Sequence, residues 1–231
     1  MSAIFVAFAS LALSSSAVVE EAEQLLSARR AEQAFILVQD AAREGDPEVV
    51  AMLAMFYDQG IHVRRNPAQA AQLYRRAAEQ GDPDAQWRLG IMIDAGRGVR
   101  APKEEAVRLF EASAAQGHGR ALVSLGVMYT LGRGVEKDSG RAFEYFEAGA
   151  RAGERHAFNE IGRAYLAGIG VDQDVVEATA WFFVAMMMGD PPAAENLALM
   201  FDNLDERAVR IASLRAAQIA EEYSEEDAVE G

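Results

Sequence analysis

Glycine recurs at a constant interval along this chain of 231 residues, with 36 residues from one member of the series to the next. Self-similarity at a fixed period of roughly 20–50 residues is typical of proteins in which stacked units bury their apolar faces against one another. The spacing therefore predicts a solenoid, and it indicates that most recurring residues serve packing. The two series are Gly45, Gly81, Gly117, Gly153 and Gly189, and Gly60, Gly96, Gly132 and Gly168.

Each repeat contains two apolar patterns with helical spacing. In the third repeat, the first pattern runs from residue 121 to 129, with small or apolar residues at i, i+4, i+5 and i+8. The second pattern runs from residue 142 to 150 and has the spacing i, i+3, i+4, i+7 and i+8. The repeat unit is therefore predicted to be a pair of helices.

Polar residues and glycines mark the ends of these helices. Asp46, Asp82 and Asp190 each precede a proline, so we expect their side chains to accept hydrogen bonds from the free N–H groups of a first helix. Asn66, Asp138 and Asp174 hold the equivalent place before a second helix. The glycines from Gly45 to Gly189 follow the second helices, where a left-handed residue commonly ends a helix.

Two further sets of glycines have a packing explanation. Gly90, Gly126 and Gly162 lie inside first helices, where glycine is about 1 kcal/mol less favourable than alanine. Their recurrence predicts close approach of a neighbouring second helix. The G-x-G turns, such as Gly132 to Gly134, resemble half of a phosphate-binding loop, but no strand precedes them. We expect turns that need positive φ, and His62 is a residue type that tolerates it.

The repeats occupy residues 46–189. Residues 18–45 are predicted to form an N-terminal helical cap that includes a partial repeat, residues 190–223 C-terminal capping helices, and residues 224–231 an acidic tail. Residues 1–17 are predicted to be a signal peptide cleaved after Ala17, because an apolar stretch from Ala3 to Leu13 precedes small residues. The localisation would then be periplasmic or secreted. The alternative is that residues 1–17 are retained as an apolar helix that caps the first repeat. The protein would then be a cytoplasmic adaptor.

Composition excludes several classes of function. The net charge is −14, and polyanionic nucleic acids need basic patches, so nucleic acid is a poor partner. The absence of cysteine excludes disulfides and thiolate zinc sites. The three histidines lie at unrelated repeat positions without metal-ligand spacing, and no hydrolase motif occurs. The sequence therefore predicts no catalytic residue, no metal and no cofactor, although it cannot show whether two carboxylates are buried together.

The repeat pattern A-x-x-x-L-G-x-x-Y-x-x-G-x-G-V, followed by D, A, an aromatic pair and G, resembles the Sel-1-like repeat, a relative of the tetratricopeptide repeat. The resemblance extends from residue 34 to about residue 201 and is most complete between Ala121 and Gly153. It implies an all-α, right-handed superhelical solenoid of antiparallel helix pairs. It also implies a non-catalytic scaffold or adaptor, such as an envelope regulatory or assembly factor, that binds a protein or peptide through its concave face. An envelope enzyme related to β-lactam-binding relatives is disfavoured, because this chain lacks their cysteines.

In tetratricopeptide relatives, first-helix residues between the packing positions line the concave face. His156, Asn159 and Arg163 have the spacing i, i+3 and i+7 and would share one face. An aromatic ring, an amide and arginines suit a peptide that carries carboxylates. An ordinary solvated helix surface, with Trp87 packed into the next repeat, is the alternative. The predicted peptide-binding set is Trp87, Asp94, Arg120, Thr130, His156, Asn159 and Arg163.

The second helix of the fourth repeat is predicted to be unusually apolar, because Trp181, Phe182 and Phe183 are followed by Met186, Met187 and Met188. Burial against the C-terminal cap explains such a sequence. The alternative is an adaptable, methionine-rich contact surface.

Overall fold

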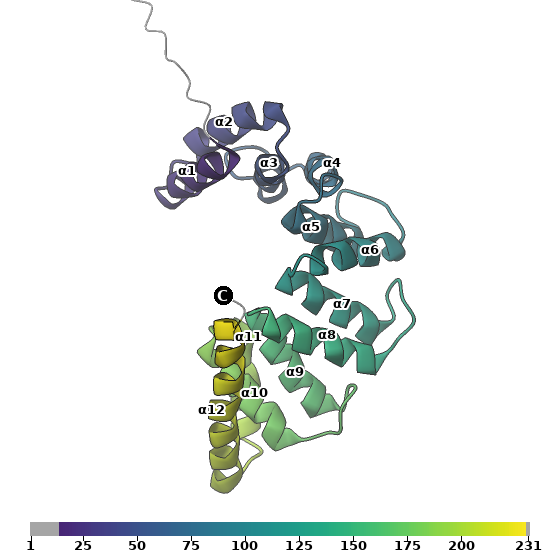
Figure 1. The fold of residues 1–231 in the computed structure, drawn as a ribbon, viewed down its shortest axis with the longest axis vertical. Helices are drawn as coiled ribbons and strands as arrows, with labels where there is room; N and C mark the ends of the chain where they lie inside the picture. The colour runs from purple at the N-terminus through teal and green to yellow at the C-terminus, as the bar shows by residue number, and fades with distance from the viewer. Residues whose placement is uncertain (1–13, 230–231) are drawn as a thin grey trace, which may run out of the picture. The chain divides into compact units, whose positions relative to one another are not determined.

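A computed structural model describes residues 14–229, with side chains through Tyr223. Twelve α-helices and one 3-10 helix make up this part of the chain, which contains no strand (Figure 1). The predicted all-α solenoid class is confirmed. The helices are α1 (Ser15–Ser27), α2 (Ala31–Ala41), η1 (Ala42–Glu44), α3 (Pro47–Gln59), α4 (Pro67–Ala78), α5 (Pro83–Asp94), α6 (Lys103–Ala114), α7 (Gly119–Leu131), α8 (Ser139–Arg151), α9 (Arg155–Ala167), α10 (Val175–Met187), α11 (Pro191–Phe201) and α12 (Glu206–Val229).

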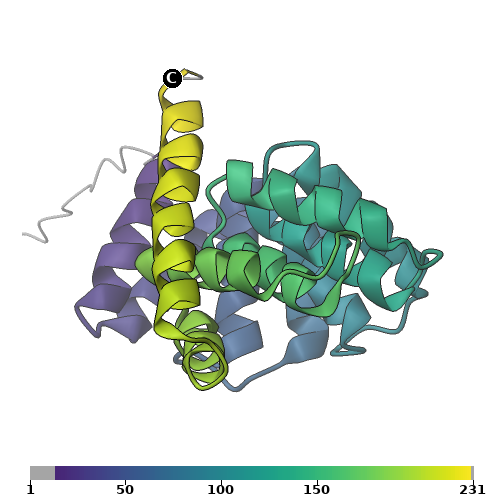
Figure 2. The same cartoon turned by 90° about the horizontal axis from the view of Figure 1, so that it is seen from below.

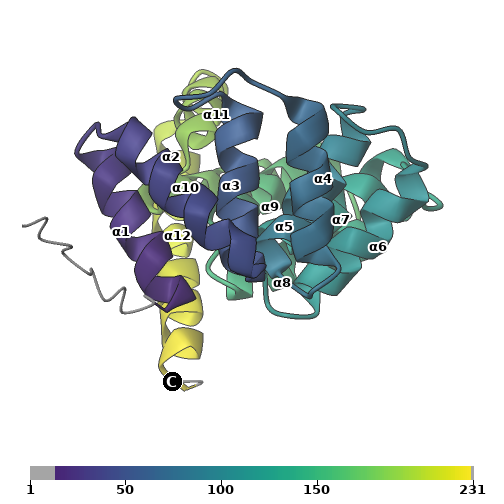
Figure 3. The same cartoon turned by 90° about the horizontal axis from the view of Figure 1, so that it is seen from above.

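The chain divides into two compact units, Met1–Arg100 and Ala101–Gly231. In the first unit, α1 packs on α2 and α3, and α4 packs on α3 and α5 (Figure 3). Val18 and Ala22 bury the apolar side of α1, and the Phe35 ring lies 5.6 Å from that of Phe56. The helices α1 and α2 therefore pack on α3, the first helix of the first repeat. The division of the chain into a cap, repeats and a tail stays a prediction. None of the helices in the described residues is long and apolar enough to cross a bilayer, and Ala3 to Leu13 lie outside that range.

In the second unit, each helix from α6 to α10 packs on its neighbour in sequence, and α12 packs on α10. Figure 2 shows the yellow α12 crossing in front of the green helices. Asp205 caps α12 by accepting a hydrogen bond from the Ala208 N–H at 2.8 Å. Trp181 and Phe182 of α10 are buried, which agrees with burial against the C-terminal cap. Met186 to Met188 are instead exposed. The aromatic part of this apolar sequence therefore belongs to the core, whereas its methionines lie at the surface.

Five of the six predicted polar caps are confirmed. Asp46 and Asp82 accept from the backbone of α3 and α5, with 2.6 Å between the Asp82 carboxylate and the Ala85 N–H. Asn66, Asp138 and Asp174 cap the second helices in the same way. The prediction for Asp190 is wrong, because its buried carboxylate pairs with Nδ1 of His156 on α9 and makes no side-chain hydrogen bond to the start of α11. The carboxylate of Asp190 therefore pairs with a side chain of another helix instead of the backbone of its own helix.

The glycines inside the first helices do allow close approach. A Cβ built on Gly126 would lie 2.6 Å from Cδ1 of Phe146 on α8, and one built on Gly162 would lie 2.7 Å from the Phe182 ring on α10. Both rings are buried and cannot swing into solvent. The missing side chain therefore makes room for the aromatic residue of the paired helix.

The turns between first and second helices combine positive φ with a second close approach. His62 has φ 62°, as predicted for its place in the first repeat. The second glycine of each G-x-G turn abuts the start of the preceding second helix. A Cβ on Gly134 would lie 2.8 Å from the backbone nitrogen of Glu104, and one on Gly170 would lie 2.8 Å from the carbonyl carbon of Ser139. The turn thus fixes the register between successive repeats.

We expect Gly126→Ala to destabilise the protein by about 1–3 kcal/mol, because the added methyl overlaps the Phe146 ring in a packed core. Gly140→Ala is the matched control. Its Cβ would meet only a carboxylate oxygen of Asp138 at 3.5 Å, so alanine should be neutral or stabilising by up to about 1 kcal/mol. Urea unfolding followed by circular dichroism measures both, and an equal effect of the two substitutions would contradict the packing explanation.

Candidate peptide-binding groove

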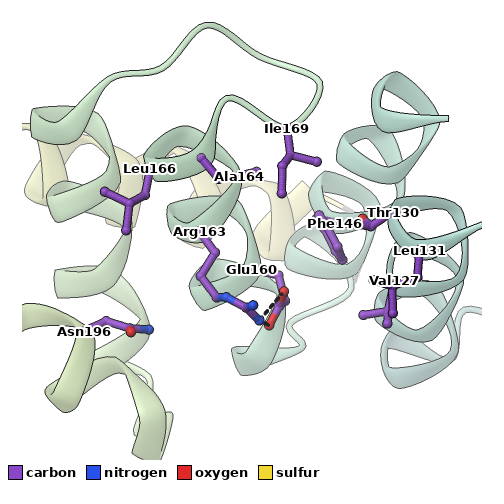
Figure 4. A pocket seen from close by; sticks show the side chains of 11 residues that line it. Val127, Thr130, Leu131, Phe146, Glu160, Arg163, Ala164, Leu166, Ile169 and Asn196 are labelled. Atoms are coloured by element: carbon purple, nitrogen blue, oxygen red, sulfur yellow. Dashed lines mark hydrogen bonds and ion pairs between the residues drawn. The ribbon is translucent and has the colours of Figure 1, made fainter. Parts of the chain in front are cut away.

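A groove with a volume of about 360 Å³ lies in the second unit, over the C-terminal halves of α7 and α9 and beside α11 (Figure 4). These three are the first helices of successive repeat positions. The groove is lined by Val127, Thr130, Leu131, Phe146, Glu160, Arg163, Ala164, Leu166, Ala167, Ile169 and Asn196.

Apolar side chains form much of the groove. Val127 and Leu131 of α7 lie on one side and Leu166 on the other, as Figure 4 shows. Phe146 reaches the groove from α8 although its ring is almost fully buried. Leu131 is 56% exposed, so its side chain is available to contact a ligand. This part of the groove suits apolar side chains of a ligand.

The polar groups of the groove are already held in place by neighbours. The Arg163 guanidinium donates to both Glu160 carboxylate oxygens, at 2.8 and 3.1 Å. The Asn196 amide donates to Oδ1 of Asn159 at 2.8 Å, and this bond joins α11 to α9. Because these side chains are held by local bonds, they lose little freedom when a ligand binds.

The structure brings together three of the residues predicted from sequence. Thr130 and Arg163 line the groove. The buried Asn159 does not line it but accepts the hydrogen bond that positions Asn196, which does. The Thr130 hydroxyl donates to the carbonyl of Gly126 at 2.8 Å, so its hydrogen is used within α7.

Two other residues of the predicted set, His156 and Arg120, do not line the groove. His156 pairs with the buried Asp190 carboxylate, and Arg120 lies 3.5 Å from the carboxylate of Glu154, the residue that caps α9. Both side chains therefore contribute to packing between the start of α9 and its neighbours.

Trp87 and Asp94 belong to α5 in the first unit. The Arg88 guanidinium lies 5.5 Å from the Trp87 ring centroid and 6.0 Å from that of Tyr74. Burial raises the pKa of Tyr74, although the nearby Arg88 opposes that shift. Trp87 is half-buried and takes part in this local cation–π cluster, which the sequence did not predict.

Sequence reasoning missed most of the apolar lining. Leu131 and Ile169 flank the turn glycines Gly132 and Gly168, at positions that are apolar in some repeats and polar in others, so the repeat pattern gave no signal there. Glu160 could have been found, because it lies three residues before Arg163, and helix positions at i and i+3 face each other. Within the described side chains, no group of three His, Asp or Glu residues could hold a metal ion.

Solved structures with a similar fold include two that are more than a quarter identical in sequence. A protective antigen of uropathogenic Escherichia coli with an SLR fold is 29% identical, with a TM-score of 0.79, over 91% of this chain and 46% of the antigen. The chain thus spans about half the length of that relative. A Sel1 repeat protein from Oxalobacter formigenes is 27% identical, with a TM-score of 0.70, over 87% of this chain and 82% of that protein.

A Sel1 repeat protein from Klebsiella pneumoniae, at 22% identity and a TM-score of 0.57 over 80% of this chain and 92% of that one, supports the fold alone. A comparison with curated proteins gives no match. The family model for the Sel1 repeat matches residues 47–82, 83–118, 119–154 and 157–190, in phase with the glycine series. With four matched repeats over more than half of its length, the chain belongs to the Sel1 repeat family.

Proposed function

We propose that this protein is a non-catalytic scaffold that holds a peptide segment of a partner protein in the groove over α7, α9 and α11. Proteins of the Sel1 repeat family are generally protein-interaction scaffolds, and they are typically non-catalytic. The observation that carries the proposal is the groove itself. It places exposed apolar side chains beside amide and charged groups that are already fixed, on three successive first helices.

The charged side chains in and around the groove indicate which kind of peptide it would bind. Arg163 is paired with Glu160, and Arg120 is paired with Glu154, so neither guanidinium faces the groove without a counter-charge. An acidic peptide would have to displace these carboxylates, which weakens the reason for expecting one. A peptide with apolar anchors fits better, because Val127, Leu131 and Ile169 supply the contact and Asn196 can bond its backbone.

We expect a photo-crosslinking residue at position 131, in the protein expressed in its native host, to form an adduct with a partner protein. The same residue at position 214 is the matched control, because Leu214 is 64% exposed on α12 and does not line the groove. Mass spectrometry of the adduct identifies the bound segment. Equal adducts from both positions would contradict groove binding.

The recovered segment then serves as a synthetic peptide. Leu131→Ser should weaken its binding by about tenfold, because most of the contribution of a buried leucine is lost, whereas Leu214→Ser should leave the dissociation constant unchanged. Fluorescence anisotropy measures both. Unchanged binding to the Leu131→Ser protein would rule out the groove as the site.

We also propose that the protein is exported and begins at Val18 after cleavage. Cleavage after Ala17 would remove Ser14, whose hydroxyl accepts from the Ala17 N–H at 3.3 Å, and the first residues of α1. It would keep Val18 and Ala22, the buried residues that pack α1. The mature chain would therefore retain the N-terminal cap of the repeats.

Intact-mass analysis of the protein from fractionated cells tests this proposal. We expect the periplasmic or secreted fraction to contain a species whose mass corresponds to residues 18–231. A mature species that begins at Met1 and stays in the cytoplasmic fraction would contradict export and favour a cytoplasmic adaptor.

A further inference from the structure

A second hollow lies in the second unit, where α8 and α10 end and α9 begins, and α12 closes one side of it. Its volume is about 150 Å³, and none of its lining residues is shared with the groove. We call it the methionine slot. It is lined by Ala150, Gly153, Phe158, Val184, Met187, Met188, Ala220 and Tyr223.

The aromatic wall of the slot is held rigidly. The Tyr223 ring of α12 lies 5.3 Å from that of Phe158 and 5.6 Å from that of Trp181, in edge-on arrangements that aromatic rings favour. Trp181 is fixed in turn, because its indole N–H donates to Glu177 at 3.1 Å, and Arg215 of α12 donates to the same carboxylate. The slot therefore exists before any ligand arrives.

The opening of the slot is apolar and adaptable. Met187 and Met188 line the slot and are 68% and 47% exposed, and the preceding Met186, which does not line the slot, is 44% exposed. Neighbouring exposed apolar side chains of this size are uncommon on a monomer surface and indicate contact with another molecule. Methionine side chains are flexible and polarisable, so they can adjust to the shape of an inserted group.

The charge around the slot is unequal on its two sides. After Arg215 the chain contains no lysine, arginine or histidine, and acidic residues dominate from Glu221 onward. Glu221 and Glu222 are exposed on α12 between Ala220 and Tyr223, and Glu222 accepts a hydrogen bond from the Arg215 guanidinium at 3.1 Å, so one of these charges is balanced within the helix. On the opposite side, Arg151 and Arg155 lie at the end of α8 and the start of α9. The α12 side is therefore the acidic one.

We propose that the methionine slot binds one apolar side chain of a partner polypeptide whose adjoining residues are basic and lie along α12. The slot is smaller than the roughly 300–1,000 Å³ of pockets that hold whole small molecules, so it suits a single leucine, isoleucine or methionine side chain. Basic residues complement the acidic end of α12 and set the direction of the bound segment. A second copy of this chain is a poor occupant, because each copy carries a net charge of −14.

The test uses protein labelled with ¹³C at the methionine methyl groups and three short synthetic peptides. The first peptide has a leucine pair followed by a run of lysines, the second has serines in place of the leucines, and the third has glutamates in place of the lysines. We expect the first peptide to shift the methyl signals of Met187 and Met188 and to leave those of Met52 and Met92 in the first unit unchanged. The other two peptides should cause no shift at equal concentration.

Variants locate the binding to the slot. Met187→Ser with Met188→Ser should weaken binding of the leucine–lysine peptide by about tenfold, measured by fluorescence anisotropy. Leu199→Ser should change it less than about twofold, because Leu199 is 59% exposed on α11 and does not line the slot. Ala220→Leu fills the slot and keeps a good helix former, so it should weaken binding as well. Circular dichroism checks that each variant remains folded.

Three outcomes would overturn the proposal. Equal binding of the serine peptide would show that charge alone attracts the ligand, and equal binding of the glutamate peptide would show that the acidic side plays no part. Methyl shifts at Met187 and Met188 on dilution without peptide would identify a second copy as the occupant.

Discussion

The repeat depends on positions where a neighbouring helix lies so close to a glycine that a Cβ on that glycine would not fit. At Gly126 the space belongs to the Phe146 ring of the paired helix, and at Gly170 it belongs to the backbone at Ser139 of the preceding one. The first contact sets the distance within a helix pair, and the second sets the register between pairs. Since both act through missing atoms, the sequence can change freely at the positions that face outward.

The two proposed binding surfaces include residues outside the repeat pattern, and they lie at opposite ends of α9. The groove lies over the C-terminal halves of α7 and α9, and the methionine slot lies where α9 begins and the second helices end. A ligand in one need not displace a ligand in the other, because no lining residue is shared. The groove has fixed polar pairs that favour a particular backbone geometry, whereas the slot has flexible methionines that tolerate variation.

The period and the local chemistry of each turn predicted the helices and five polar caps, because those features depend on residues a few positions apart. Asp190 failed as a cap since His156, in the preceding repeat unit, competes for its carboxylate. The Asn159–Asn196 bond also joins residues separated by about one period. That residues about one period apart lie close together could thus be inferred from the alignment of repeats, but the side-chain directions that select one pair over another could not.

The slot is also a consequence of how a solenoid ends. Within the repeats, a second helix packs an aromatic ring against a glycine of its first helix, as Phe146 does at Gly126 and Phe182 of α10 does at Gly162. The rest of α10 is covered by α11 and by α12, which does not belong to the repeat and brings Ala220 and Tyr223 to the end of α10. A helix without the repeat's spacing covers Trp181 but leaves Met187 and Met188 outside. A binding site at this end therefore arises from the mismatch between a periodic core and a non-periodic cap, so its specificity can change without disturbing the repeats.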